Sequence, residues 1–88
     1  MSKVTLSKDV VFRDLSGEAV LLNLATGSYY GLNEVGTRMW TLLAEHGSPD
    51  KVLQLLLEEY DVTEDALRSD LDALIRDLES KGVIRLDP

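Results

Sequence analysis

Residues 20 to 40, VLLNLATGSYYGLNEVGTRMW, constrain the fold of this 88-residue chain more than any other segment. An apolar run is followed by a Thr-Gly turn, a short aromatic run and an Asn-Glu pair typical of a helix start. The pattern predicts a strand over Glu18–Leu24, a hairpin turn, a strand over Ser28–Leu32 and a helix capped by Asn33. Because Ser28–Leu32 lies between a hairpin and a helix, we expect it at a sheet edge with one row of backbone groups unpaired.

The remaining elements follow from apolar periodicity and from turn residues. Val10–Leu15 is a β-prone run that predicts a first strand. Three helices are predicted over residues 34–45, 49–60 and 64–81, with Asn33, Ser48 and Thr63 as their N-caps. Residues 83–86 could form a last short strand or an extended tail. The predicted fold is therefore α+β, a three-stranded antiparallel sheet followed by three helices, with residues 1–8 flexible and 9–88 a single domain.

Charge and composition exclude several classes of function. The chain carries 16 acidic and nine basic residues, a net charge of −7, which argues against nucleic acid as a partner because phosphates would be repelled. The N-terminal segment has no apolar run long enough for a secretory signal or a membrane span. We therefore expect a soluble cytoplasmic protein that does not associate with membranes.

Groups that could carry catalysis or bind a metal are scarce. The chain has no cysteine and one histidine, His46, which precedes Gly47 and suits a helix C-terminus. A metal site needs more ligands than His46 has nearby, and no glycine-rich phosphate loop is present. The sequence predicts a protein that is not an enzyme, with no metal and no cofactor.

An ordered set of short motifs spans most of the chain. It comprises Leu22-Asn23, Thr26-Gly27, Tyr29-Tyr30, Leu32-Asn33, Gly36, Trp40, Glu58-Glu59-Tyr60-Asp61-Val62 and Lys81-Gly82-Val83-Ile84. With this set the chain resembles the coenzyme PQQ synthesis protein D (PqqD) family. The resemblance runs from about Val10 to Leu86, and it depends on the order and spacing of the motifs rather than on any single one.

The resemblance implies a winged helix-turn-helix-like domain that acts as a peptide chaperone. Relatives of this kind, the precursor-peptide (RiPP) recognition elements, bind the leader segment of a ribosomally made precursor peptide. They present it to a modifying enzyme, often of the radical SAM type. The implied pathway is PQQ biosynthesis or a related peptide-maturation pathway.

In such relatives the guest peptide adds as an antiparallel strand to the third strand and packs beside the third helix. Carried onto this chain, Ser28–Leu32 would supply the backbone hydrogen bonds, and main-chain pairing of this kind gives affinity without sequence specificity. Gly31 would admit a closely approaching backbone, although a bulge is an equally good explanation of a glycine there. Tyr29 and Tyr30 point to opposite faces, so we expect one in the core and the other in contact with the guest.

The third helix would supply the groove wall. Its apolar stripe consists of Leu67, Leu71, Leu74, Ile75 and Leu78. Leu71 and Ile75 are the expected wall residues, and the alternative is that all five are core. Arg68 could meet an acidic residue of the leader, and Arg76 likewise. The alternative is that these arginines pair with Glu64 and Asp72 on the helix surface.

Three alternatives follow from the same elements. The helix order alone suits a helix-turn-helix DNA-binding regulator, but residues 61–79 hold seven acidic and two basic residues where such a protein would read DNA. An accessory subunit could use that acidic helix only to hold an enzyme partner. An unpaired edge strand can also pair with a second copy, which would give a homodimer through Ser28–Leu32.

Overall fold

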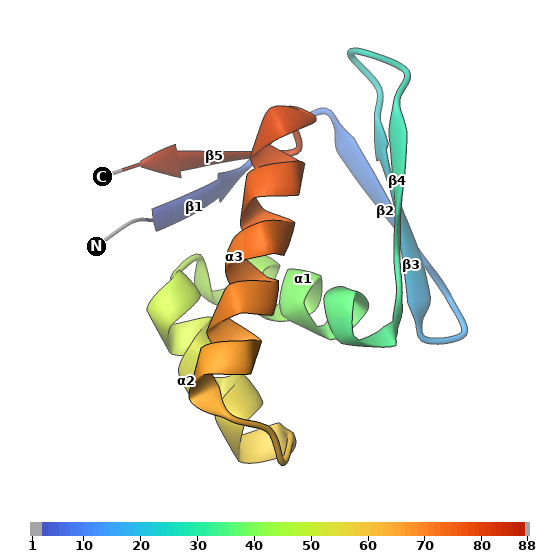
Figure 1. Ribbon diagram of the computed structural model, residues 1–88. Helices are drawn as coiled ribbons and strands as arrows, with labels where there is room; N and C mark the ends of the chain where they lie inside the picture. The colour runs from blue at the N-terminus through green and yellow to red at the C-terminus, as the bar shows by residue number, and fades with distance from the viewer. Residues whose placement is uncertain (1–2, 88) are drawn as a thin grey trace.

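Three consecutive strands form an antiparallel sheet in the order β2-β3-β4 (Figure 1). The computed structural model describes residues 3–87. The strands are β2, Val10–Leu15; β3, Glu18–Asn23; and β4, Tyr29–Leu32. Each strand pairs with its neighbour in the chain, so β2 and β4 are the two edges. The predicted strands are confirmed, and their ends differ from the expected ones by at most one residue.

The helices begin at the predicted caps. They are α1, Glu34–His46; α2, Pro49–Glu59; and α3, Glu64–Ser80. At each start the side-chain oxygen of Asn33, Ser48 or Thr63 accepts a hydrogen bond from the backbone N–H three residues further on. Gly47 ends α1 in the left-handed conformation, at φ 69°. The α+β fold, a three-stranded sheet followed by three helices, is confirmed.

A second, two-stranded sheet joins the two ends of the chain. β1, Lys3–Leu6, pairs antiparallel with β5, Ile84–Asp87, which settles the open choice between a last strand and a tail. Val4 is buried, and its N–H donates to the Gly47 carbonyl at 2.7 Å. The expected flexible segment over 1–8 is therefore corrected for residues 3–6, which form a paired strand that includes the buried Val4. Residues 1 and 2, and residue 88 of the expected 9–88 domain, lie outside the described residues.

The helices pack on one face of the three-stranded sheet (Figure 1). From the sheet, Ala19, Leu21 and Leu32 enter the core. From β2, the Phe12 ring stacks on Trp40 of α1, with ring centroids 6.4 Å apart. All five apolar residues of the α3 stripe are buried in the same cluster. The sheet and α3 are therefore held by one continuous core, which fixes the position of β4 relative to α3.

The opposite face of the sheet, the outer face, carries a row of apolar side chains. Val11, Leu22 and Tyr29 lie side by side in register across β2, β3 and β4. Their exposed fractions are 39%, 36% and 75%. No element among residues 3–87 covers this face in Figure 1.

A threonine hydroxyl connects the sheet to the first helix. Oγ1 of buried Thr37 accepts a hydrogen bond from the Ala19 N–H at 2.9 Å and donates to the Leu32 carbonyl at 3.5 Å. The hydroxyl stands between the paired residues Ala19 and Leu32, at the point where β4 runs into α1. It therefore satisfies two backbone groups at the end of the strand pair and ties β4 to the helix.

A Thr37→Val variant is expected to lower the free energy of unfolding by about 2 kcal/mol. Valine keeps the shape but leaves the buried Ala19 N–H without its partner, and an unsatisfied buried group costs about 1–3 kcal/mol. Urea unfolding of both proteins measures the difference. Thr41→Val is the matched control, because the Thr41 hydroxyl only donates back to the Thr37 carbonyl of its own helix. Equal losses in the two variants would contradict the bridging role.

Candidate functional site

One side of β4 has no strand partner among residues 3–87. On the paired side, the Asn23 N–H donates to the Ser28 carbonyl at 2.8 Å. Since antiparallel pairs alternate, Tyr30 and Leu32 direct their backbone groups toward β3 in the same way. Tyr29 and Gly31 therefore direct their N–H and C=O groups away from β3, toward the open edge. The edge predicted for Ser28–Leu32 offers two donors and two acceptors.

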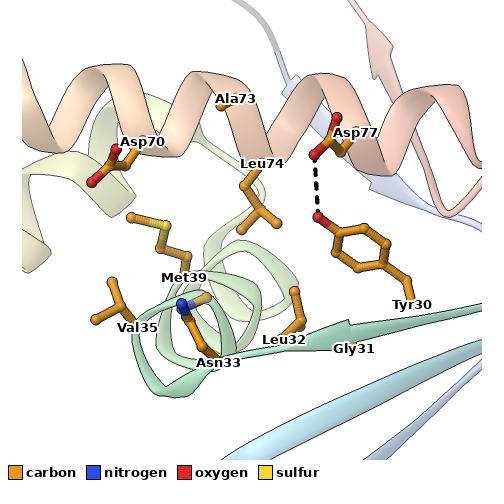
Figure 2. A pocket seen from close by; sticks show the side chains of 11 residues that line it. Tyr30, Gly31, Leu32, Asn33, Val35, Met39, Asp70, Ala73, Leu74 and Asp77 are labelled. Atoms are coloured by element: carbon orange, nitrogen blue, oxygen red, sulfur yellow. Dashed lines mark hydrogen bonds between the residues drawn. The ribbon is translucent and has the colours of Figure 1, made fainter.

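A groove of about 450 Å³ lies beside this edge, between β4, the start of α1 and α3. Its apolar lining includes Leu32, Met39 and Leu74, which converge between the strand and the helix (Figure 2). The complete lining is Tyr30, Gly31, Leu32, Asn33, Val35, Gly36, Met39, Asp70, Ala73, Leu74 and Asp77. The groove is thus apolar at its centre, with polar groups on the helix side.

Local backbone geometry at the strand–helix junction shapes one end of the groove. The Asn33 side chain accepts a hydrogen bond from the Gly36 N–H at 2.8 Å, which starts α1 directly after β4. A Cβ added at Gly36 would lie 3.2 Å from Asn33 Oδ1 and 3.4 Å from Leu32 Cδ2. Glycine at this position therefore lets the first turn of α1 approach the end of β4 closely.

A side-chain hydrogen bond spans the other end of the groove. Tyr30 Oη donates to Asp77 Oδ2 at 3.2 Å, joining β4 to the last turns of α3 (Figure 2). The Lys81 ammonium lies 5.4 Å from the centre of the Tyr30 ring. Partial burial raises the pKa of Tyr30, and the negative charge and hydrogen bond of Asp77 raise it further.

This raised pKa predicts a pH-dependent stability. Because the pKa of Tyr30 is higher in the folded protein than the ordinary 10.0, its contribution is complete below pH 10 and is lost as the pH rises through the folded value. The free energy of unfolding of wild type should exceed that of Tyr30→Phe by less than about 1 kcal/mol at neutral pH, and the difference should shrink in strongly alkaline solution. Urea unfolding of wild type and Tyr30→Phe from neutral to strongly alkaline pH measures this difference. In an Asp77→Asn variant, tyrosinate absorbance should show that Tyr30 loses its proton at a lower pH than in wild type. An unchanged titration would contradict the contribution of Asp77 to the raised pKa of Tyr30.

The structure brings only some of the predicted site residues together. Tyr30, Gly31 and Leu32 line the groove. Ser28 and Tyr29 are exposed beside it, Ser28 in the hairpin turn and Tyr29 at the start of β4. The two tyrosines do point to opposite faces of the sheet, Tyr30 toward α3 and Tyr29 away from it.

The expected positions of Leu71 and Ile75 need correction. Their exposed fractions are 2% and 5%, and neither lines the groove. Ile75 instead borders a small cleft with Leu86 of β5 and the start of α2. The groove side of α3 is formed by positions 70, 73, 74 and 77, whose centre lies roughly 130° around the helix from that of 71 and 75. Leu74, expected in the core, is the stripe residue that reaches the groove.

Arg68 also lies away from β4. Its guanidinium donates to Glu64 at 2.8 Å, the i,i+4 pair that was the alternative explanation, and this hydrogen bond raises its pKa. The corresponding pair of Arg76 with Asp72 is not among the ion pairs found within residues 3–87. Arg68 and Arg76 line a separate exposed cleft of α3 with Asp65 and Asp72, and this cleft shares only Ala73 with the groove.

Sequence reasoning missed most of the helical lining. Asp70 and Asp77 appeared only as surface charge, although 70, 73, 74 and 77 follow the i, i+3, i+4, i+7 spacing of one helix side. Met39 is one of several buried residues of α1, and apolar periodicity does not show which of them borders a cavity. No group of three or more possible metal ligands occurs within residues 3–87. No helix in this range is both long and apolar enough to cross a membrane.

Comparisons with known proteins agree with this geometry. A family model described as coenzyme PQQ synthesis protein D (PqqD) matches residues 18–84. A solved structure described as TbiB1 in complex with the TbiA(beta) leader peptide is 36% identical, covers 91% of this chain and 93% of its own, and has a TM-score of 0.85. Another solved structure, described as lasso peptide synthetase B1 complexed with the leader peptide, is 26% identical. It covers 94% of this chain and 98% of its own, and has a TM-score of 0.83. No curated protein sequence matches the chain significantly.

Proposed function

Because the chain belongs to the PqqD family, we propose that it binds the leader segment of a ribosomally made precursor peptide and presents it to a modifying enzyme. Two similar structures are described as leader-peptide complexes, and their similarity extends over nearly the whole of this chain. One of these descriptions names a lasso peptide synthetase, whereas the family name refers to PQQ synthesis. The proposal therefore covers peptide-maturation pathways in general, and PQQ biosynthesis is one of them. Because precursors of this kind are made by ribosomes, the proposal includes action in the cytoplasm.

The open edge of β4 beside the groove is the observation that carries this proposal. A guest strand aligned antiparallel to β4 would pair with the outward N–H and C=O groups of Tyr29 and Gly31. Backbone hydrogen bonds contribute about 0.5–1.5 kcal/mol each, and they do so for any sequence. Discrimination between peptides must therefore come from side chains that enter the groove.

The role proposed for the protein is binding and presentation rather than catalysis. The groove residues are apolar side chains, two aspartates, an asparagine and a tyrosine that already donates to Asp77. The pKa of that tyrosine, Tyr30, is raised rather than lowered, so its hydroxyl is not activated as a nucleophile. The chemistry would belong to the enzyme partner, for which the radical SAM class and the lasso synthetases are the candidates.

A titration of ¹⁵N-labelled protein with the synthetic leader of a precursor encoded beside its gene tests the proposal. Backbone amides of residues 28–32 and 70–77 should shift, while those of α2 should not. A scrambled leader of the same composition, which keeps only the backbone pairing, should bind more weakly, and a DNA duplex should leave the spectrum unchanged. Saturable shifts confined to other surfaces would overturn the site.

The same edge could pair with a second copy of the chain. A homodimer formed through β4 would use the outward groups of Tyr29 and Gly31 that the guest strand needs. Peptide and partner copy would then compete, and sedimentation with and without leader peptide would show this as dissociation of the dimer.

A further inference from the structure

The helix wall of the groove carries two carboxylates and no cation. Asp70 and Asp77 stand on either side of Leu74 along α3 (Figure 2). Asp77 uses one oxygen to accept the Tyr30 hydroxyl, and Asp70 takes part in none of the ion pairs found within residues 3–87. No lysine or arginine occurs among the eleven lining residues. No cationic side chain among the lining residues therefore neutralises the negative charge of these two aspartates.

Three basic side chains of the surrounding elements are not among the groove-lining residues. Lys81 lies against the Tyr30 ring and borders a different, smaller cleft with Ser28 and Tyr29. The Arg38 guanidinium donates a bidentate pair of hydrogen bonds to the Glu59 carboxylate. Arg76 lines a separate cleft, which shares only Ala73 with the groove. With a net charge of −7, the whole chain adds to the negative potential that a guest meets on approach.

We infer that the groove selects a basic leader segment, one in which a lysine or arginine lies two residues from an apolar side chain on the face turned toward α3. The inference rests on the proposed function and names the chemistry of its ligand. It also reverses the expectation from Arg68, which would have selected an acidic leader. The groove's charged residues are aspartates, so the complementary guest is basic.

The spacing of the wall residues supports this pattern. Leu74 lies four residues from Asp70 and three from Asp77, or about 6 Å and 4.5 Å along the helix axis. In an extended guest, residues on the same face recur every second position, about 6.7 Å apart. An apolar guest residue against Leu74 and Met39 therefore places the next residue on that face within reach of a carboxylate, and the long stem of lysine or arginine tolerates the remaining offset.

Selection from a phage-displayed library of random 12-residue peptides tests the inference. The baits are wild type, the groove variant Asp70→Lys/Asp77→Lys, and a control variant Asp65→Lys/Asp72→Lys, which has the same net charge but alters the opposite side of α3. Wild type and control should enrich peptides with a lysine or arginine two residues from an apolar residue. The groove variant should lose that enrichment and gain acidic residues. Asp70→Lys alone serves as a milder groove variant, because it leaves the Tyr30–Asp77 hydrogen bond in place.

The outcomes separate the inference from the proposed function. Enriched peptides without a basic preference, or equal losses in the groove and control variants, overturn the inference and leave peptide binding intact. Absence of any enrichment over bait-free selection overturns both. For one selected peptide, changing its basic residue to glutamate should weaken binding to wild type about tenfold in fluorescence anisotropy. Asp70→Lys should restore part of that loss, and no restoration would contradict a direct pairing with Asp70.

Discussion

A Gly31→Pro variant is expected to bind leader peptide at least about thirtyfold more weakly than wild type. The Gly31 N–H points to the open edge of β4, so proline removes a donor that only the guest uses. The ring also occupies the place where the guest carbonyl would approach. The lost hydrogen bond and the steric block together cost about 2 kcal/mol or more, which is roughly thirtyfold in affinity. Isothermal titration calorimetry with the synthetic leader measures the change.

Gly31→Ala is the matched control. A Cβ at Gly31 meets no atom within 4 Å, and alanine keeps the backbone N–H. Its affinity should lie within about twofold of wild type. The pairing of β4 with β3 does not use the Gly31 N–H, so proline at this edge should leave a cooperative unfolding transition. Equal affinity of the proline variant and wild type would show that the guest does not pair with this edge.

A Leu71→Ala variant is expected to lose about 3 kcal/mol of unfolding free energy while its folded fraction binds leader peptide normally. Leu71 is among the most deeply buried residues of the core, and truncation of such a leucine costs about 2–5 kcal/mol. In a domain of this size, a loss of that magnitude lowers the melting temperature by roughly 12–24 °C. Thermal and urea unfolding give the change in stability, and titration below the transition gives the affinity.

Asp72→Ala, next to Leu71 but exposed, controls for effects on the helix itself. It should change the free energy of unfolding by no more than about 0.5 kcal/mol. The pair of measurements separates a core residue from a groove residue. If Leu71→Ala instead weakened binding tenfold with little loss of stability, Leu71 would belong to the groove wall after all.

Local signals were sufficient to predict most of the fold. Asn33, Ser48 and Thr63 cap the helices as expected, because capping depends on a side chain and a backbone N–H only three residues away. The hairpins likewise follow from turns between adjacent strands. β1 could not be predicted in this way. Its partner β5 lies at the other end of the chain, and Thr5 reaches Asp87 across 82 positions.

The site was predictable on its strand side and not on its helix side. The open edge at residues 28–32 follows from the order of hairpin, strand and helix, all of it local. The groove wall depends instead on how α3 is rotated about its own axis. Leu71 and Leu74 lie only about 60° apart around the helix, so a rotation of that size exchanges them at the groove, and both leucines belong to one apolar stripe. Packing against α2 and β5, which local signals do not describe, fixes that rotation.

The uncovered outer face of the sheet has a consequence for how a guest would be held. In a strand added to β4, every second side chain would stand beside Tyr29 and Gly31 and continue the row begun by Val11 and Leu22. No element within residues 3–87 covers that row. The peptide would be held through its backbone hydrogen bonds, while half of its side chains remain exposed to solvent. A second protein could then contact those side chains while the peptide stays bound.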